Sequence, residues 1–521
     1  MYYAKNPILP GFRPDPSICR VDGDYYIVNS SFAYFPGVPI YHSQDLAHWE
    51  QIGNVLTRES QLPLDGCGHS EGIFAPTLRH HKGIFYMITT NISRGGNFIV
   101  MAQNPEGPWS EPYYLGEAAQ GIDPSIYFEE DTQGNTHCYY IGTRPNTEGV
   151  RYDGDWEIWM EEIDLEKMQL KGCGRKVWKS ALSDAVWPEG PHLYKIGDYY
   201  YILHAEGGTG SNHSICVARS EHLWGPYQGN PNNPILTHRH LGYDYPVTAV
   251  GHGDLVEDGH GNWYMVMLAS RKCMGYVNTG RDTFLAKVVW ENGWPVVNLG
   301  VGRLEDTVEL EGEVSYVMPE SGVYHFFREK LPAEFLMLRN PSKNAVSLSE
   351  RTGYLRLRTL PQTLMEKVSP AYIGVRQQDY DYQATAVMEF TPAEMEEAGL
   401  CVVCEDGWHL RFIKRMCHQK EMISLILCQN GIEETVIQKE VQGEILSLKI
   451  VNWGQEASFY YYSVDNDWKL LAKNIDMHIF STECAGGFTG CTIGMYASAN
   501  GTKRDNYADF ALFSYERMVA E

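Results

Sequence analysis

The sequence lacks any run of about 18 apolar residues, the length that a transmembrane helix requires, so no membrane-spanning segment is expected. Basic residues are also few: 42 Lys and Arg stand against 66 Asp and Glu, giving a formal net charge of −24. Because nucleic acids and anionic membranes bind to basic surfaces, neither is an expected partner. The first residues lack the charged and then apolar pattern of a signal peptide, which predicts a cytoplasmic protein.

Paired cysteine motifs are scarce as well. The 12 Cys stand mostly alone in strand-like apolar runs, which favours reduced core residues over disulfides. The single CxxC, formed by Cys401 and Cys404, lies in the strand-like segment GLCVVCED. Residues three apart on a strand point to opposite faces, so joint metal chelation is not expected there.

Helical periodicity is almost absent from the first three fifths of the chain, and a repeat takes its place. Five segments each precede a turn and an aromatic-rich strand such as YYIV or FYMI: they are PDPSI with Asp15, FAPTL with Ala75, IDPSI with Asp123, PEGPHL with Glu189 and GHGDL with His252. Self-similarity at a fixed period, built from short strands, is typical of propeller blades. The repeats therefore predict a five-bladed β-propeller whose innermost strands place these five residues around one central channel.

The pattern changes after the fifth repeat. We predict a propeller over residues 1–303, an acidic linker over 304–324, and a second all-β domain over 325–521. The last segment contains strand pairs that alternate polar and apolar residues, without the blade repeat, as in a two-sheet sandwich of the jelly-roll kind. It has few grouped carboxylates, so we expect it to support the site rather than supply its chemistry.

Three carboxylates share one phase of the repeat. Asp15, Asp123 and Glu189 would converge on the channel, while the second copy carries Ala75 at this position. Each Asp-Pro pair alone is ordinary turn chemistry, but a turn does not require an acid at the same phase in three of five copies. Hydrolysis of a glycosidic bond requires one carboxylic acid to protonate the leaving oxygen and one carboxylate to activate water. A third carboxylate would raise the pKa of the acid by charge repulsion.

The remaining candidates have two readings each. His252 is either a neutral, hydrogen-bonded histidine or a ligand of a hard, mostly water-coordinated ion such as calcium; no further ligand has the spacing of a zinc site. Phe32 and Phe74 lie near the channel end, where they either pack between blades or form a flat wall for a sugar. Arg281 either pairs with Asp282 or Glu291 at the surface or donates a forked hydrogen bond inside the site.

Together these segments resemble glycoside hydrolase family 43, in its β-xylosidase and α-L-arabinofuranosidase branch with an appended β-sandwich. The resemblance rests on NPILPGFRPDPSI, SFAYFPGVPIYHSQDLAHW, GIFAPTL, GIDPSI, WPEGPHLY, AEGG, GHGDLVE and GRDTFLAKVVWENGWPVV, and it spans nearly the whole chain. It implies a five-bladed propeller and inverting chemistry with no cofactor required.

The resemblance also implies roles for individual residues. Asp15 corresponds to the general base, Asp123 to a residue that modulates pKa and orients the acid, and Glu189 to the general acid. His252 matches a channel histidine that is often found beside calcium or another divalent ion, and Arg281 and Phe32 match residues that contact the sugar. Phe488, in AGGFTG, matches a phenylalanine that the sandwich sends into the pocket rim, and Phe74 stands where many relatives have tryptophan.

The expected activity is therefore exo-acting hydrolysis that releases xylose, arabinose or both from the non-reducing ends of xylo-oligosaccharides and arabinoxylan fragments. Alternatives are an α-L-arabinofuranosidase with no second main activity, an endo-arabinanase, and a sugar-binding propeller without chemistry. Relatives of this branch often form homo-oligomers, so self-association is an expectation drawn from the resemblance alone.

Overall fold

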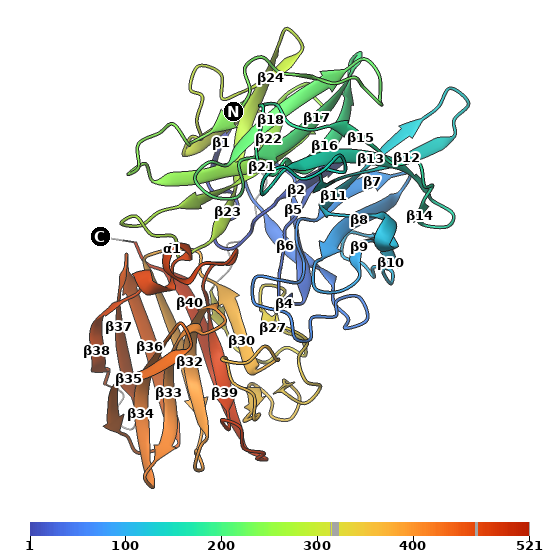
Figure 1. Ribbon diagram of the computed structural model, residues 1–521. Coiled ribbons are helices and arrows are strands. Elements are labelled where there is room, and N and C mark those ends of the chain that lie inside the picture. Colours follow the sequence, from blue (N-terminus) through green and yellow to red (C-terminus); the bar gives the residue numbers. More distant parts are fainter. Residues whose placement is uncertain (313, 315–321, 464–466, 520–521) are drawn as a thin grey trace.

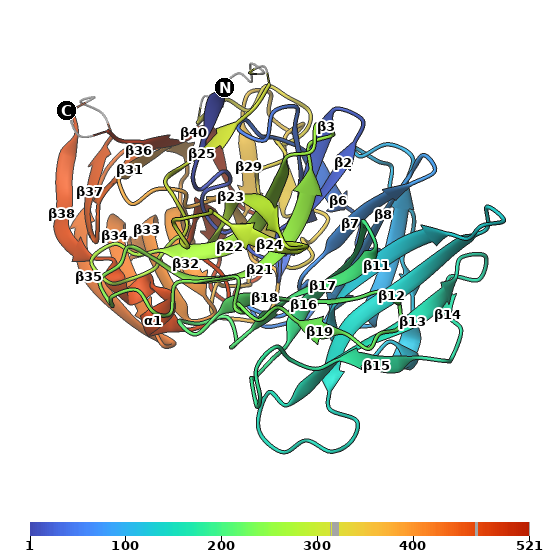
Figure 2. The same ribbon diagram turned by 90° about the horizontal axis from the view of Figure 1, so that it is seen from above.

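The computed structural model describes residues 1–312, 314, 322–463 and 467–519, which are almost entirely β-structure (Figure 1). The N-terminal part, blue to yellow-green in Figure 1, is a propeller, and the orange to red part beside it is a sandwich. Seen from above, the sandwich lies against one side of the propeller (Figure 2). The prediction of an all-β propeller followed by a β-sandwich is confirmed.

Five antiparallel sheets make up the propeller. The first two are β2 (Ser17–Val21), β3 (Asp24–Val28), β5 (Gly37–Ser43) and β6 (Glu50–Leu56), then β7 (Thr77–His81), β8 (Ile84–Asn91), β9 (Gly96–Ala102) and β10 (Tyr113–Tyr114). The third contains β11 (Ile122–Glu130), β12 (Thr136–Pro145), β13 (Trp156–Asp164), β14 (Gln169–Leu170) and β15 (Arg175–Trp178). The fourth contains β16 (Glu189–Ile196), β17 (Tyr199–Glu206), β18 (Ser214–Ser220), β19 (Gln228–Gly229) and β20 (Leu236–Thr237). The fifth contains β21 (Val247–Glu257), β22 (Trp263–Arg271), β23 (Arg281–Glu291) and β24 (Trp294–Val297).

The first strand of each sheet is the innermost one, and these strands close a ring. Each of β2, β7, β11 and β16 contacts the next inner strand, and β21 returns to contact β2. Outside the ring, β1 (Tyr2–Lys5) pairs with β25 (Thr307–Leu310), which lies within the predicted acidic linker. The remainder of that linker includes residues 313 and 315–321, which lie outside the described residues. The domain boundaries themselves stay a prediction.

A buried carboxylate in the ring, Asp254 on β21, joins four inner strands. Its oxygens accept hydrogen bonds from Ser17 Oγ at 2.8 Å and from the Ile18 amide at 3.0 Å, both on β2. They also accept from Arg79 Nη1 and Nη2 on β7, at 2.9 and 3.0 Å, and from Tyr194 Oη on β16 at 2.5 Å. Because the inner strands of a propeller carry few mutual backbone bonds, this side-chain cluster replaces them as a tie between sheets.

The sandwich has two sheets. One contains β26 (Val323–Tyr324), β28 (Val346–Ser347), β29 (Leu355–Arg358), β31 (Tyr382–Glu389), β36 (Ile445–Trp453), β37 (Glu456–Tyr462), β38 (Lys469–Asp476) and β40 (Tyr507–Arg517). The other runs in the order β30 (Ala371–Arg376), β39 (Thr492–Ser498), β32 (Glu397–Glu405), β33 (Trp408–Cys417), β34 (Lys420–Gln429) and β35 (Ile432–Glu440). The helices among the described residues are short: η1 (Gly116–Ala118), η2 (His478–Phe480) and α1 (Thr482–Ala485). None of them is long and apolar enough to cross a membrane.

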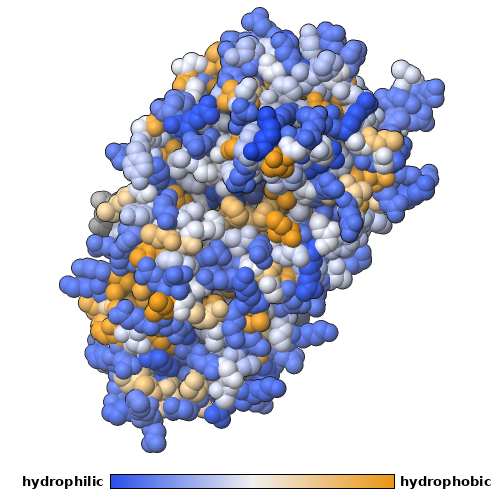
Figure 3. Space-filling view, viewed as in Figure 1, coloured by the Kyte–Doolittle hydropathy of each residue, from blue (hydrophilic) through white to orange (hydrophobic). Residues whose placement is uncertain are grey.

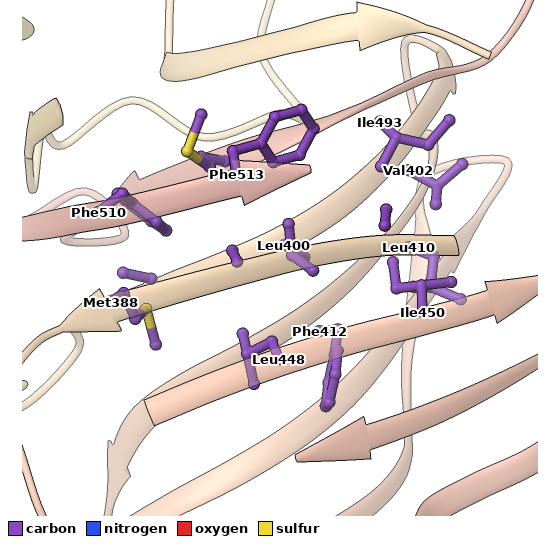
Figure 4. Close-up of a cluster of buried hydrophobic side chains, with 14 of the residues drawn as sticks. Met388, Leu400, Val402, Leu410, Phe412, Leu448, Ile450, Ile493, Phe510 and Phe513 are labelled. Atoms are coloured by element: carbon purple, nitrogen blue, oxygen red, sulfur yellow. The ribbon is translucent and has the colours of Figure 1, made fainter. Parts of the chain in front are cut away.

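The core of the sandwich follows the alternation seen in the sequence. Every second residue of β31 is buried, and its apolar side chains meet those of the facing sheet. Figure 4 shows these side chains between the two sheets: Met388, Leu400, Val402, Leu410, Phe412, Leu448, Ile450, Ile493, Phe510 and Phe513. On the face of the molecule shown in Figure 3, hydrophilic residues dominate and hydrophobic ones form small separate groups.

The two domains share backbone and side-chain contacts. A two-stranded sheet is formed by β4 (Tyr34–Phe35) of the propeller region and β27 (Met337–Leu338). Arg339, which follows β27, is buried and pairs with Asp406 at 2.8 Å. Asp406 lies in the turn between β32 and β33 and also accepts a hydrogen bond from the His69 amide. The sandwich is thereby fixed against the end of the propeller where Asp15 lies.

Candidate active site

The repeat places its marker residues at a distortion of the inner strands. Asp15 precedes β2, whereas Asp123, Glu189 and His252 belong to β11, β16 and β21. Asp15, Asp123 and His252 have φ angles of 51°, 52° and 50°, a left-handed conformation that is uncommon outside glycine. The register of β11, β16 and β21 shifts at the same places. Such bulges redirect a side chain from the sheet surface, here toward the channel.

All the predicted site residues converge. One cavity of about 350 Å³ is lined by each of them: Asp15, Phe32, Phe74, Asp123, Glu189, His252, Arg281 and Phe488. Ala75, the repeat position with an apolar residue, lines it too. The pseudo-symmetry read from the sequence therefore corresponds to a real meeting point, since the equivalent residue of all five repeats lines this cavity.

Asp15 is the carboxylate with charged and polar partners. Arg281 Nη1 lies 3.1 Å from Asp15 Oδ1, and the Ser30 hydroxyl donates a hydrogen bond of 2.6 Å to Oδ2. His252 Nδ1 is 3.7 Å from the same Oδ1 atom. Burial opposes ionisation of Asp15, but Arg281, His252 and the Ser30 hydrogen bond together outweigh it and lower its pKa. Asp15 is therefore ionised at neutral pH.

The pKa values of Asp123 and Glu189 are raised, whereas that of Asp15 is lowered. Burial and the charge of Asp15 raise the pKa of Asp123 to about 6, against the attraction of His252. Burial, followed by the charges of Asp123 and Asp15, raises the pKa of Glu189 well above its usual range. The cavity therefore holds one carboxylate that is ionised and one carboxylic acid that keeps its proton.

Three phenylalanines form one wall. The rings of Phe32 and Phe74 have centroids 5.3 Å apart, and Phe488 stacks on Phe32 at 6.0 Å. Phe74 meets Phe488 edge-on at 6.1 Å. A continuous apolar face of this kind is suited to the flat C–H face of a sugar ring. The alternative reading of Phe32 and Phe74 as packing residues also holds in part, since Phe32 is buried and belongs to the core cluster at the domain boundary.

Phe488 reaches the cavity from the sandwich, in the loop between α1 and β39. Its amide donates to Ser70 Oγ at 2.8 Å, and its carbonyl accepts from Arg281 Nη2 at 3.3 Å. Gly280 and Gly490 are packed so closely that a Cβ on Gly280 would lie 2.8 Å from the Gly490 amide nitrogen. The propeller thus holds the Phe488 loop at three places. A neighbouring hollow of about 460 Å³ shares Phe488 and Arg281 with the cavity.

Several lining residues were not among the predicted ones: Ile122, Trp156, Trp187, Gly208, Thr209 and His213. Trp156 starts the third strand of its sheet and Thr209 lies in a loop, so neither occupies the phase of the repeat that identified the others. Thr209 accepts a hydrogen bond of 3.0 Å from Arg281. His213 is buried, and that burial lowers its pKa to about 3, so its ring is neutral.

His252 does not sit in a cage of metal ligands. Around it, the described part of the chain supplies no group of three metal-binding side chains. The oxygens of Asp15 already face Arg281 and Ser30, and a Cβ on Gly190 would lie 2.7 Å from the His252 ring. Calcium requires six to eight oxygen ligands, which these side chains do not provide. The residues present therefore do not fit a protein-built calcium site.

The sequence and the fold were compared with known proteins. Residues 4–295 match glycosyl hydrolases family 43, and residues 323–516 match the beta xylosidase C-terminal concanavalin A-like domain. A xylosidase/arabinosidase from Butyrivibrio fibrisolvens is 50% identical, over 99% of this chain and 100% of its own length. A non-reducing end α-L-arabinofuranosidase from Bacteroides ovatus is 39% identical, over 98% of this chain and 94% of its own. The crystal structure of xylan β-1,4-xylosidase from Bacillus halodurans superposes with a TM-score of 0.92 at 32% identity, covering 99% of this chain and 100% of that one.

Proposed function

This chain belongs to glycosyl hydrolase family 43, and from that premise we propose that it is an exo-acting, inverting glycosidase that releases xylose and arabinose from the non-reducing ends of xylo-oligosaccharides and arabinoxylan fragments. The observation that carries the proposal is the pairing, in one cavity, of an ionised Asp15 with a protonated Glu189. These are the two protonation states that single-step hydrolysis requires.

The residues divide the work as follows. Asp15 takes a proton from a water molecule whose oxygen attacks the anomeric carbon. Glu189 gives its proton to the glycosidic oxygen as the bond to that carbon breaks, so the leaving sugar departs as a neutral alcohol. Asp123 raises the pKa of Glu189 by its charge and touches neither reacting atom in this scheme. Attack from the face opposite the leaving group inverts the anomeric configuration.

The shape of the site supports cleavage at a chain end. Phe488 and its loop lie across the cavity rim, and about 350 Å³ accommodates a single sugar ring with its immediate neighbour rather than a long chain. Arg281 faces the cavity beside the stacked rings of Phe32 and Phe488, with its guanidinium carbon 5.8 and 5.7 Å from their centroids. It is placed to donate to sugar hydroxyls as well as to Asp15.

Replacement of Glu189 by Gln tests the acid. The variant should lose most of its kcat on xylobiose, whose leaving group needs a proton, and much less on an aryl glycoside with a good leaving group. Asp15→Ala should abolish turnover of both. Equal losses for Glu189→Gln on the two substrates would contradict the acid assignment. A first-formed sugar with the same anomeric configuration as the substrate, seen by proton NMR, would contradict inversion.

The sugar preference is tested separately. The values of kcat/KM on aryl β-xyloside and on aryl α-L-arabinofuranoside distinguish a dual enzyme from one whose only main activity is α-L-arabinofuranosidase. The same assays with and without chelator test whether a divalent ion contributes. The relative from Bacteroides ovatus is named an α-L-arabinofuranosidase, and the one from Butyrivibrio fibrisolvens is named a xylosidase/arabinosidase. A ladder of products from linear arabinan would favour an endo-arabinanase instead, and binding without cleavage a sugar-binding propeller.

A further inference from the structure

A second cluster of reactive side chains lies in the sandwich, far in sequence from the cavity residues of the propeller. His409 on β33 pairs in register with Cys428 on β34, and Cys428 pairs with Glu433 on β35. Side chains directly opposite each other on neighbouring strands share one face of the sheet. The three therefore form a row across three adjacent strands, and their ligand atoms all lie within 4.8 Å of one another.

His409 is the unusual member of this row. Its side chain is 1% exposed, yet neither ring nitrogen has a hydrogen-bond partner among the described residues. A buried polar group left unpaired costs about 1–3 kcal/mol, so such groups call for an explanation. Nε2 of His409 faces Glu433, with 3.9 Å between it and Oε1. That separation is too long for a hydrogen bond but close to the distance between two ligands of one ion.

The donor atoms suit a borderline-to-soft divalent ion. One imidazole nitrogen, one thiolate sulfur and one carboxylate oxygen are the ligands that zinc takes, at about 2.0–2.3 Å. We propose that His409, Cys428 and Glu433 bind a Zn²⁺ ion, with a water molecule in the fourth position. The partly exposed carboxylate of Glu433 leaves that position open to solvent, since its side chain is 42% exposed.

The surroundings are compatible with a bound cation. Arg411 lies on β33 next to the row, but its guanidinium already pairs with Glu397 and Glu433, so two carboxylates offset its charge. Glu433 Oε1, the oxygen that faces His409, also accepts the hydrogen bond from Arg411, so it would be shared between Arg411 and the ion. Cys428 Sγ lies 3.2 Å from Met365 Sδ and donates to the Gly407 carbonyl at 3.2 Å. On binding, the thiol releases its proton to solvent and exchanges that hydrogen bond for a bond to the metal.

The ion would hold an otherwise weakly attached strand. β35 is the edge strand of its sheet, and all of its residues are exposed. Among the described strands, only β34 pairs with it. A metal bond from Glu433 to His409 would reinforce the ion pair by which Arg411 on β33, the second strand inward, already holds Glu433 on β35. Zinc should therefore slow amide hydrogen exchange in β35 and in the facing part of β34.

The test uses the full-length protein after removal of bound metal by a chelator. Titration with Zn²⁺ in a calorimeter should give one site per chain, and Co²⁺ at the same site should show a sulfur-to-metal charge-transfer band. Cys428→Ser and His409→Gln should each weaken Zn²⁺ binding by more than about 100-fold, beyond the loss expected for an outer-shell partner. Cys417→Ser, on the same strand β33 but outside the row, is the matched control and should bind as the unaltered chain does.

Glu433→Gln keeps the test decisive if a buried variant fails to fold, because Glu433 is at the surface. It should weaken Zn²⁺ binding at least about tenfold, because one of the three protein ligands loses its charge. Retained hydrolysis of an aryl glycoside reports that each variant is folded. Absence of one-to-one binding, or binding unchanged in Glu433→Gln and in whichever buried variant folds, would overturn the proposal.

Discussion

Asp254 gives the sharpest test of how the propeller ring is held together. Asp254→Asn preserves the size of the side chain but removes its negative charge. That charge pairs with Arg79 on β7, and the same carboxylate binds β2 and β16. Asp254 is fully buried, and five donor atoms converge on its two oxygens. The asparagine amide has an NH₂ group in place of one carboxylate oxygen. At least one of the five donors would then face another donor instead of an acceptor.

The magnitude follows from the burial of the pair. The side chain of Arg79 is only 18% exposed, so loss of its partner leaves a guanidinium with little access to water. Removing one member of a buried pair costs about 3–5 kcal/mol. For a domain of this size, 1 kcal/mol corresponds to about 2 °C in Tm, so Asp254→Asn should melt about 6–10 °C lower.

Thermal unfolding followed by circular dichroism checks this value. Glu111→Gln is the matched control, because Glu111 pairs with Arg58 at 2.7 Å but both side chains are exposed. That change should leave Tm unaltered. The double variant Arg79→Met with Asp254→Asn should be less destabilised than the sum of the single variants, since no unpaired charge remains. A Tm for Asp254→Asn within about 2 °C of the unaltered chain, or strict additivity in the double variant, would refute the role of this cluster.

Three further predictions concern the cavity. Asp123→Asn should move the basic limb of the pH profile of kcat/KM to lower pH, because the charge of Asp123 raises the pKa of Glu189, which must stay protonated; an unmoved limb would contradict this. Phe488→Ala should raise KM about 3- to 10-fold through loss of aromatic contacts, whereas the exposed Phe327→Ala should not; equal KM values in steady-state assays would exclude a contact with substrate. Gly190→Ala should lower kcat while Tm changes little, because the new Cβ would displace His252; a lower Tm with an unchanged kcat would indicate a purely structural role.

The fold and the carboxylates could be predicted because both follow from repetition. A side chain at one phase of a repeated strand has a fixed direction, so three acids at that phase of the propeller must meet whatever the loops do. Arg281 was predicted with two alternatives, and the pairing with Asp282 is not found: Asp282 pairs with Arg271 at 2.8 Å instead. The cytoplasmic location and the oligomeric state stay predictions.

The features that could not be predicted depend on contacts between segments that no pattern connects. The tie at Asp254 was overlooked although GHGDL contains it, since its partners come from three other repeats. The row of His409, Cys428 and Glu433 was invisible because register across three strands, not spacing along one, brings it together. Reasoning along a single strand placed Cys401 and Cys404 on opposite faces, and they lie in different core clusters, but such reasoning cannot detect a site formed across neighbouring strands.

Arg281 connects the chemistry of the propeller to the position of the sandwich. One nitrogen of its guanidinium pairs with Asp15 and the other donates to the Phe488 carbonyl. The position of the Phe488 loop therefore affects how firmly Arg281 is held against Asp15, and with it the pKa of the proposed base. A change confined to the loop contacts, such as Ser70→Ala, which removes the acceptor for the Phe488 amide, should then shift the acidic limb of the pH profile to higher pH. Loss of the rim alone would instead change KM and leave that limb in place, so the two outcomes distinguish a sandwich that only closes the pocket from one that also tunes its acid–base pair.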